Sequence, residues 1–417
     1  MRVVRAVVSR GPVWLGALEP FPVASPWWAD AEPVTNHLSE LLGTPATVLR
    51  LVDVVGGDAP AGGLVTYHVE VGELPPVDPG WQPVSADELV AIAAPDPRRA
   101  AYAEPGGPSV DLHWADTELG ALDRPRTGIA TQVKTWNLSC VHRIPTAAGP
   151  AWLKRVSAWQ TPESVVIAAA AAIDPGLVPT VLAADAGAGR TLVEHAVGED
   201  CWSPDPLTVG QAVERWVAVQ RELATDAARR RLLAAGVPDW SLSRMEERLT
   251  TTLLGPPSAL PHPERGILGD LVEGLPARLA ALADAGLSDT LVHGDFQGGN
   301  WRSDGSRLVL MDWSDASVSH PALDLVGLLA ALPPDRRVAT LDRWAARWRA
   351  AVPGCDPYAA AALVEPLHPL QAGLLYQRFL DHIEPSERRY HEGDPATMVR
   401  AAADRAFGAR TVLSSRG

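Results

Sequence analysis

The sequence is poor in cysteine, and the few cysteines it has lie far apart. Among 417 residues there are only Cys140, Cys201 and Cys355. No pair has the C-x-x-C spacing of a metal knuckle or a redox motif. A disulfide framework is equally unexpected, because such frameworks need several paired cysteines in a short chain.

Long hydrophobic runs and net positive charge are also missing. No stretch reaches the 18 consecutive apolar residues that a membrane-spanning helix needs. Arg2, Arg5 and Arg10 break up the apolar residues at the start, which is untypical of a signal peptide. The net charge of -14 should repel nucleic-acid phosphates and anionic lipids, but it suits a cationic small molecule. These features predict a cytoplasmic protein that binds neither nucleic acid nor membranes.

Lysine is almost absent, although the chain has 36 basic residues. Only Lys134 and Lys154 are lysines, and the others are arginines. Where arginine is the default cation, a retained lysine indicates a position that needs a compact point charge. The alternative for both lysines is a chance occurrence.

The rest of the composition is that of a globular protein with several parts. Hydrophobic residues make up 47% and charged residues 21% of the chain, whose length allows two or three packed units. The pattern predicts a small α/β cap domain with a Pro/Gly-rich linker at 1–127, a β-rich lobe at 128–200 and a helical lobe at 201–417. We expect residues 1–127 to brace the lobe that follows, because their linker enters directly before its strands.

Apolar periodicity and turn residues predict the individual elements. In the first two parts, helices are predicted at 34–42, 86–93 and 161–172, and strands at 47–55, 64–71, 139–143, 151–156, 181–184 and 191–194. In the third part, helices are predicted at about 267–285, 322–331, 335–350, 357–382 and 395–408, and one β-hairpin at 291–315. The helix after Leu207 presents one face formed by Val209, Val213, Trp216, Gln220 and Leu223, of which only Gln220 is polar.

The predicted hairpin carries most of the reactive side chains. Asp295 and Asn300 follow its first apolar strand, and Asp312 follows its second, where strands give way to loops. Phosphoryl transfer needs an acceptor for the hydroxyl proton, magnesium and in-line positioning. Asp295 can supply the acceptor, while Asn300 and Asp312 can supply the hard oxygen ligands that magnesium takes. Gly298 and Gly299 should let the loop bend back tightly.

The spacing matches H-x-D-x-x-x-x-N with a downstream aspartate, beginning at His293. With this motif the chain resembles the aminoglycoside phosphotransferase and choline kinase-like family of small-molecule kinases, in which the loop reads HGD and an aromatic residue follows the metal aspartate, as Trp313 does here. The resemblance covers 128–417. It implies an α+β, bilobal protein kinase-like fold, with a small β-rich N-lobe and a large helical C-lobe, preceded here by the small α/β N-terminal cap domain.

The resemblance also implies a role for each matching residue of the catalytic loop. Asp295 would be the catalytic base, Asn300 and Asp312 would hold Mg2+, and His293 and Asp324 would support the loop. For Asp324 the alternative is an ordinary charge at a helix start. Trp301 and Trp313 are expected to pack rather than to stack on a substrate.

Upstream residues would bind the nucleotide, which the resemblance implies is ATP or GTP. Lys154 would contact its phosphates, with Glu163 as the helix partner of Lys154. For Glu163 too, the alternative is a helix-start charge. Asn137 and Ser139 lie in a segment that resembles the loop over the phosphates, although this loop has no glycine.

The acceptor site is predicted near the C-terminal helices, where acidic residues of this family often hold cationic substrates. The candidates are Asp381, Glu384 and Glu387, and the alternative is a solvated acidic loop balanced by neighbouring arginines. The leading hypothesis is Mg-dependent transfer of a γ-phosphate to a hydroxyl of an antibiotic, amino sugar or similar hydroxylated metabolite. The alternative is a catalytically silent, nucleotide-binding regulatory protein on the same fold, which the missing glycines of the phosphate loop keep open.

Overall fold

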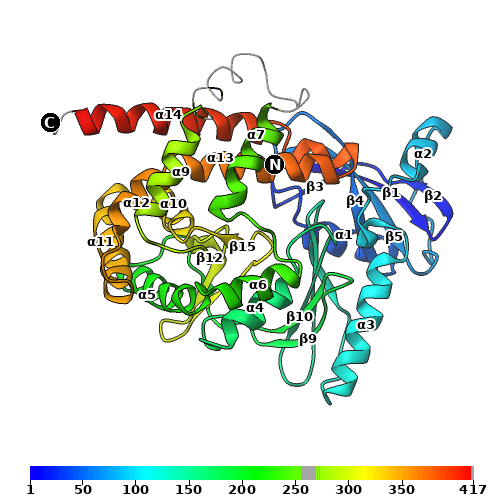
Figure 1. The fold of residues 1–417 in the computed structure, drawn as a ribbon. Coiled ribbons are helices and arrows are strands. Elements are labelled where there is room, and N and C mark those ends of the chain that lie inside the picture. Colours follow the sequence, from blue (N-terminus) through cyan, green and yellow to red (C-terminus); the bar gives the residue numbers. More distant parts are fainter. Residues whose placement is uncertain (255–268, 270, 272, 415–417) are drawn as a thin grey trace. The chain divides into compact units, whose positions relative to one another are not determined.

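The structure is a computed structural model that describes residues 1–254, 269, 271 and 273–414 (Figure 1). It divides into two compact units. The first unit comprises Met1–Trp159, Val181–His195 and Phe379–Glu392, and the second comprises Gln160–Thr180, Ala196–Arg378 and Gly393–Gly417. The predicted cap and most of the predicted β-rich lobe thus share one unit, and the division at residue 127 stays a prediction. Among the described residues, no helix is long and apolar enough to span a membrane.

One sheet of the first unit lies wholly within residues 1–127. Its strands are β1 (Arg2–Arg10), β2 (Val13–Ala17), β3 (Phe21–Val23), β4 (Ala46–Val55) and β5 (Gly63–Val71), in the order β2-β1-β5-β4 with β3 also on β1. Strands β1 and β5 are parallel, and the other pairs are antiparallel. Helix α1 (Glu32–Leu42) packs Val34, Leu38 and Leu42 into the core of this sheet.

The predicted elements of this part are confirmed, but the strands β1, β2 and β3 and the helix α3 escaped prediction. Helices α1 and α2 (Ala86–Ala93) and strands β4 and β5 lie where expected. Strand β1 was missed because its arginines look like surface residues, whereas Arg2 is fully buried and donates to Tyr67 Oη (2.9 Å) and to the Trp28 carbonyl (3.1 Å). Helix α3 (Gly107–Ala121) was missed because its apolar residues do not gather on one face.

The second sheet of the first unit contains the predicted nucleotide strands. Its strands are β6 (Thr131–Thr135), β7 (Ser139–Ile144), β8 (Ala151–Val156), β9 (Val181–Asp185) and β10 (Arg190–Glu194). They lie in the order β6-β7-β8-β10-β9, and all neighbouring strands are antiparallel. The buried side chain of Gln132 on β6 joins this sheet to the first one. Its amide oxygen accepts from the Val48 amide (2.9 Å), and its amide nitrogen donates to the Val48 carbonyl (2.8 Å).

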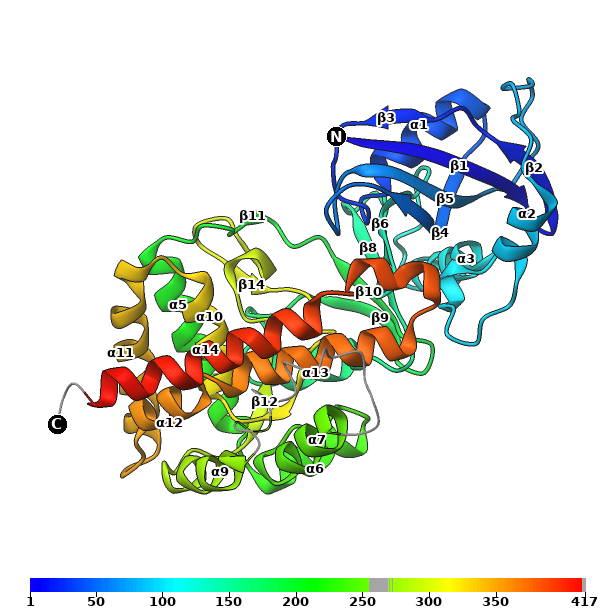
Figure 2. The same cartoon turned by 90° about the horizontal axis from the view of Figure 1, so that it is seen from above.

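Helices make up most of the second unit. They are α4 (Glu163–Ala171), α5 (Pro206–Leu223), α6 (Asp226–Ala234), α7 (Leu242–Leu254), α9 (Leu275–Asp284), α10 (Ala322–Ala331), α11 (Pro334–Ala351), α12 (Pro357–Val364), α13 (Leu367–His382, whose end from Phe379 belongs to the first unit) and α14 (Asp394–Ser414). Pro366 separates α12 from α13, so the prediction of a single helix at 357–382 is wrong. Helix α14 lies along α13, where Gly373 leaves room for Met398 (Figure 2).

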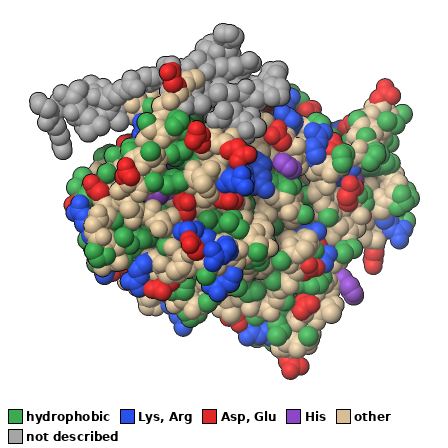
Figure 3. All heavy atoms as spheres, in the orientation of Figure 1, with side chains coloured by type: hydrophobic (Ala, Val, Ile, Leu, Met, Phe, Trp, Pro, Cys, Tyr) green, Lys and Arg blue, Asp and Glu red, His purple; other side chains and the backbone are tan. Residues whose placement is uncertain are grey.

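Two small sheets replace the single predicted hairpin. Strand β12 (Thr290–Val292) pairs with β15 (Ser317–Ser319), while β13 (Trp301–Ser303) pairs with β11 (Glu199–Asp200) and β14 (Leu308–Leu310). The two strands recognised in the sequence, β12 and β14, are therefore not partners. Trp301 and Trp313 are fully buried, which confirms their packing role. On the face drawn in Figure 3, acidic and basic side chains are interspersed.

Candidate active site

The catalytic loop begins at His293, where β12 ends. The backbone geometry at its first glycine, Gly294, excludes any other residue. Gly294 has φ +86°, in the left-handed region that favours glycine. A Cβ atom at this position would lie 2.2 Å from the carbonyl oxygen of Asp315. The pairing of β12 with β15 brings these two backbones together, so this position of the His-Gly-Asp motif requires glycine.

Asp324, at the start of α10, holds the catalytic loop through its backbone. Its carboxylate accepts from the amides of His293 (2.9 Å) and Gly294 (3.0 Å), and also from Trp216 Nε1 (2.7 Å) and Gln220 Nε2 (3.0 Å). Complete burial raises the pKa of Asp324 to about 6, while these hydrogen bonds favour the ionised form. The contacts make Asp324 more than a helix-start charge.

His293 joins the catalytic loop to the segment that leads to Asp312. Its ring is buried, and Nε2 lies 3.0 Å from the Met311 carbonyl oxygen, so this nitrogen carries the proton. The ring also packs against Trp313, with 4.5 Å between the centroids. His293 therefore has a structural place in the site, in line with the support role that was predicted for it.

Asp295 and Asn300 are in direct contact at the centre of the loop. The amide nitrogen of Asn300 donates to Asp295 Oδ2 (2.7 Å) and to the Asp295 carbonyl (3.0 Å), and Gln297 Nε2 donates to Asp295 Oδ1 (3.0 Å). Burial, followed by the neighbouring charge of Asp312, raises the pKa of Asp295. The amide nitrogen of Asn300 thus fixes the side chain of Asp295, and a metal-binding role for Asn300 stays a prediction.

Pairing of β13 with β14 places Asp312 beside Asn300. The Met311 amide donates to the Asn300 carbonyl (2.7 Å), and Asp312 follows directly. Asp312 has φ +61°, a left-handed conformation that is uncommon for a residue other than glycine but is tolerated by aspartate. Its exposed carboxylate accepts from Ser314 Oγ (2.9 Å). A strained backbone at this position is typical of functional sites.

The donor set of this site fits magnesium that arrives with a nucleotide. It consists of one carboxylate, from Asp312, and one amide oxygen, from Asn300. Within the described part of the chain, no group of three or more His, Cys, Asp or Glu residues could hold a metal ion by itself. Magnesium is usually held by one or two carboxylates together with substrate phosphates and water, so a sparse set of this kind is expected for it.

Glu163 contacts the backbone immediately after Asp312. Its carboxylate is buried and accepts from the amide of Trp313 (2.8 Å). Lys154 lies on β8, the middle strand of its sheet, opposite Val141 and Thr191. Lys154 belongs to the first unit and Glu163 to the second, and their pairing stays a prediction.

Asn137 and Ser139 lie at the turn between β6 and β7. The Trp136 indole donates to Ser139 Oγ (3.0 Å), and the Trp136 amide donates to the Ser139 carbonyl (3.0 Å). Both Asn137 and Ser139 are buried. Their contact with a nucleotide stays a prediction.

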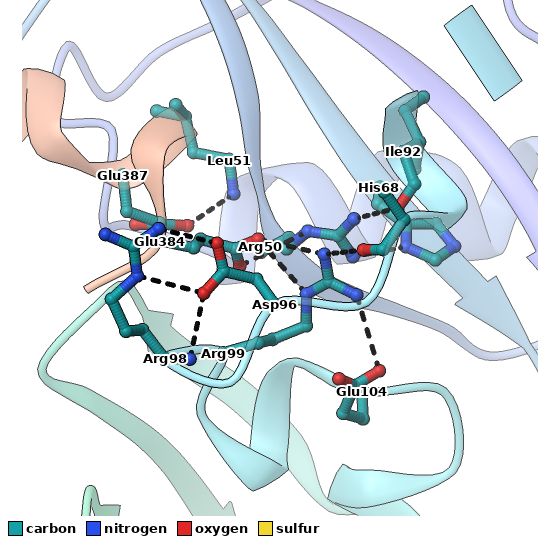
Figure 4. Close-up of polar contacts among 11 residues, drawn as sticks. Arg50, Leu51, His68, Ile92, Asp96, Arg98, Arg99, Glu104, Glu384 and Glu387 are labelled. Atoms are coloured by element: carbon teal, nitrogen blue, oxygen red, sulfur yellow. Dashed lines mark hydrogen bonds and ion pairs between the residues drawn. The ribbon is translucent and has the colours of Figure 1, made fainter. Parts of the chain in front are cut away.

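Two of the three acceptor candidates use their carboxylates in contacts with strand β4 of the first sheet (Figure 4). Glu384 forms ion pairs with Arg50 (3.4 Å) and Arg99 (3.1 Å), and Glu387 accepts from the Leu51 amide (2.8 Å). Both glutamates are buried, whereas Asp381 is exposed. An acceptor role for these residues stays a prediction, and the contacts of the two glutamates do not favour it.

Gly298 and Gly299 serve the loop in a different way from the one predicted. Neither has a positive φ, and both lie in a 3-10 turn, Gly298–Asn300. A Cβ on Gly298 would lie 2.1 Å from the Cys201 carbonyl oxygen, and one on Gly299 would lie 2.6 Å from the Trp202 ring. Glycine is needed here because segment 201–204 approaches the turn closely.

The substitution Gly298→Ala should destabilise the protein by about 1–3 kcal/mol, the usual cost of overpacking against a backbone that cannot move aside. Activity should fall as well, because the turn carries Asn300. Gly393→Ala is the matched control, since its Cβ meets nothing within 4 Å. Urea unfolding of both variants checks the prediction. Equal stability of the two variants would contradict the conclusion that segment 201–204 approaches Gly298 too closely for a side chain.

One feature of the sequence could have predicted the hydrogen-bond donors to Asp324. Gln220 was the single polar residue on the predicted apolar face of its helix, and a polar side chain there needs a buried partner. In the structure that partner is Asp324, and Trp216 on the same face is the other donor. The backbone contact of Glu163 had no such signal, because 150 residues separate it from Trp313.

Comparisons with known proteins agree with this geometry. Residues 139–360 match the model of the phosphotransferase enzyme family (APH). No curated protein sequence matches the chain. The fold is similar to that of the GDP complex of wild-type aminoglycoside 2′-phosphotransferase-IIIa, with a TM-score of 0.50 and 14% identity over 71% of this chain and 99% of that one. This likeness confirms the predicted α+β protein kinase-like fold, while the N-terminal cap stays a prediction.

Two other solved structures are less similar in shape. A choline/ethanolamine kinase family protein from Mesorhizobium loti has a TM-score of 0.48 and 18% identity, over 72% of this chain and 98% of that one. A macrolide 2′-phosphotransferase type I has a TM-score of 0.48 and 17% identity, over 70% of this chain and 97% of that one.

Proposed function

Because this chain belongs to the phosphotransferase enzyme family and is a phosphotransferase with a hydroxyl acceptor, we propose that it transfers the γ-phosphate of ATP or GTP to a small hydroxylated molecule. An antibiotic, an amino sugar or a similar metabolite would be the acceptor. The observation that carries this proposal is the pair Asp295 and Asn300 on a loop whose backbone is held by Asp324, with Asp312 following the strand that pairs beside Asn300.

Each side chain of the assembly would have a distinct task. Asp295 would orient the acceptor hydroxyl and take its proton, and its raised pKa makes it a better proton acceptor than an ordinary carboxylate. Asn300 keeps Asp295 in place through its amide nitrogen. Asn300 and Asp312 would hold Mg2+, which when bound neutralises phosphate charge. Lys154 would contact the phosphates of the nucleotide.

A small pocket beside Gly294 supports a cationic acceptor. It has a volume of about 50 Å3, and its lining includes Asp315, His368 and Gln371. Burial first, and then the field of the carboxylates of Asp394, Asp295 and Asp315, raise the pKa of Tyr376 to about 12. A protonated amine on the acceptor would be favoured by this field.

The substitution Lys154→Ala should raise the nucleotide KM by about tenfold or more, because the loss of one phosphate contact of about 1.4 kcal/mol changes affinity by that factor. The only other lysine of the chain provides the control. Lys134 is exposed on β6, and Lys134→Ala should leave the nucleotide KM within about twofold. Steady-state kinetics with varied nucleotide checks both. Equal effects of the two substitutions would contradict a phosphate role for Lys154.

A phosphate-transfer screen tests the proposed function directly. It would combine Mg2+ and either ATP or GTP with aminoglycosides, other hydroxylated antibiotics, amino sugars and amino alcohols, with Asp295→Asn as the control protein. Turnover that the control protein lacks would support the proposal and identify the acceptor. Tight nucleotide binding without turnover of any acceptor would favour the silent regulatory protein instead.

A further inference from the structure

The first unit contains a cavity that no step of the proposed phosphate transfer uses. Its volume is about 510 Å3, within the range of about 300–1,000 Å3 that is usual for small-molecule sites. Residues of strand β4, of segment 88–99 and of segment 384–389 line it, and all of them belong to the first unit. Asp295, Asn300 and Asp312 belong to the second unit. The cavity is therefore built from residues other than those proposed for catalysis.

Three buried charged side chains form part of the cavity wall (Figure 4). Glu384 pairs with Arg50 at 3.4 Å and with Arg99 at 3.1 Å, and each of the three side chains is at most 7% exposed. Arg50 also donates to His68 Nδ1 (2.9 Å) and Arg99 to the Ala94 carbonyl (2.7 Å), so both guanidinium groups are fixed. Burial raises the pKa of Glu384 and lowers that of Arg50, so desolvation opposes these charges. Because apolar residues often stabilise a protein at least as well as a buried ion pair, this network on a cavity wall indicates a binding surface.

Other polar groups of the wall are available to a ligand. The side chains of Asp53 and Arg389 are exposed, and neither forms a hydrogen bond or an ion pair with the described part of the chain. The hydroxyl of Ser386 is buried, and no described residue is its hydrogen-bond partner. A buried hydroxyl without a partner is unfavourable, so a bound group that completes its hydrogen bonding would be stabilised.

The mixture of donors and acceptors on the wall indicates the chemistry of the ligand. The lining residues include three arginines, which only donate, and four carboxylates, which only accept. A phosphate would therefore also meet carboxylates, and an ammonium group would also meet arginines. A hydroxyl group both donates and accepts, so a neutral molecule with several hydroxyls can satisfy both kinds of side chain without adding an uncompensated charge.

We propose that this cavity is a binding site for a neutral mono- or disaccharide. Asp53, Ser386 and Arg389 hydrogen-bond the sugar hydroxyls, and the network of Glu384 with its two arginines forms the wall behind them. The site is additional to the proposed acceptor site, and its occupancy is measurable without turnover. The first unit thereby gains a ligand of its own, beyond a part in nucleotide binding.

Calorimetric titration of the full-length chain tests the inference. Glucose, maltose, sucrose and trehalose are the neutral probes, while glucose 6-phosphate and glucosamine carry a negative and a positive charge on the same sugar. At least one neutral sugar should bind, and more tightly than either charged probe. Failure of all four neutral sugars to bind would overturn the inference.

The substitution Ala91→Trp shows whether the sugar binds in this cavity. Ala91 lines the cavity from α2 and is exposed, so an indole there should fill the cavity without disturbing the core. The Kd of the bound sugar should rise by about tenfold or more, which corresponds to about 1.4 kcal/mol. Ala93→Trp is the matched control, because Ala93 is exposed on the same helix but does not line the cavity. Its Kd should stay within about twofold of the parent value, as is usual for surface substitutions.

Arg389→Ala provides an independent check, because it removes donors from the wall without filling the cavity. The Kd should rise by about three- to tenfold, the usual effect of losing a hydrogen bond to a charged group or a neutral one. Arg10→Ala is the control, since Arg10 is exposed in the same unit and lies outside the cavity lining. Parental affinity in both Ala91→Trp and Arg389→Ala would place the sugar elsewhere and overturn the inference. Tighter binding of a charged probe that Ala91→Trp abolishes would show that the proposed ligand class is wrong.

Discussion

Replacing Asp295 with asparagine should lower turnover by about 10²–10⁴-fold, the usual contribution of a positioned general base. The asparagine side chain has the same shape and retains an oxygen for the amide nitrogen of Asn300. The loop should therefore keep its structure, because its backbone is held separately by Asp324. Nucleotide affinity should change less than threefold. Single-turnover kinetics together with a nucleotide titration would separate the two effects.

Asp284→Asn is the matched control for this experiment. Asp284 is exposed at the end of α9, and its replacement removes the same charge from the same unit. Its turnover should stay within about twofold of the parent protein. If Asp295→Asn retained parental turnover, Asp295 could not be the base. If it lost nucleotide binding to the same extent as turnover, the defect would lie in the loop rather than in proton transfer.

The sequence was sufficient to predict that Asp295 and Asn300 lie together, because they are local to one another. Asp295 and Asn300 are five residues apart on one loop, and apolar strands on either side predicted where the loop begins and ends. The strand partners could not be predicted in the same way. Strands β12 and β14 are too short to specify a register, and their pairing with β15 and β13 depends on contacts that the hydrophobic pattern does not encode.

Buried charges were the largest source of error in the sequence interpretation. Glu384 and Glu387 were predicted to lie in an acceptor site or, alternatively, in a solvated acidic loop, and the burial of Arg2 was not foreseen, because charged side chains are seldom fully buried unless they are paired. Pairing decides the outcome, and the partners are remote. Glu387 is 336 residues from Leu51, and Arg99 is 285 residues from Glu384. No periodicity in a single sequence reports such contacts.

The second large effect is expected at Asp312. The substitution Asp312→Asn should lower turnover by about 10²–10³-fold, since a metal ion contributes several kcal/mol of transition-state charge stabilisation and each 1.4 kcal/mol is about tenfold in rate. Asparagine adopts the left-handed backbone at least as readily as aspartate, so φ +61° can be kept and the loss can be assigned to the carboxylate. Half-maximal activity should then require a higher Mg2+ concentration.

Initial rates over a range of Mg2+ concentrations, at saturating nucleotide, would measure both changes at Asp312. Asp295→Asn provides the contrast, because loss of the base should lower the maximal rate without changing the Mg2+ requirement. The charge of Asp312 acts on Asp295, yet only Asp312 is proposed to be a ligand. An unchanged Mg2+ requirement in Asp312→Asn would show that the metal is held elsewhere, whereas a shift of equal size in both variants would show that Asp295 also binds it.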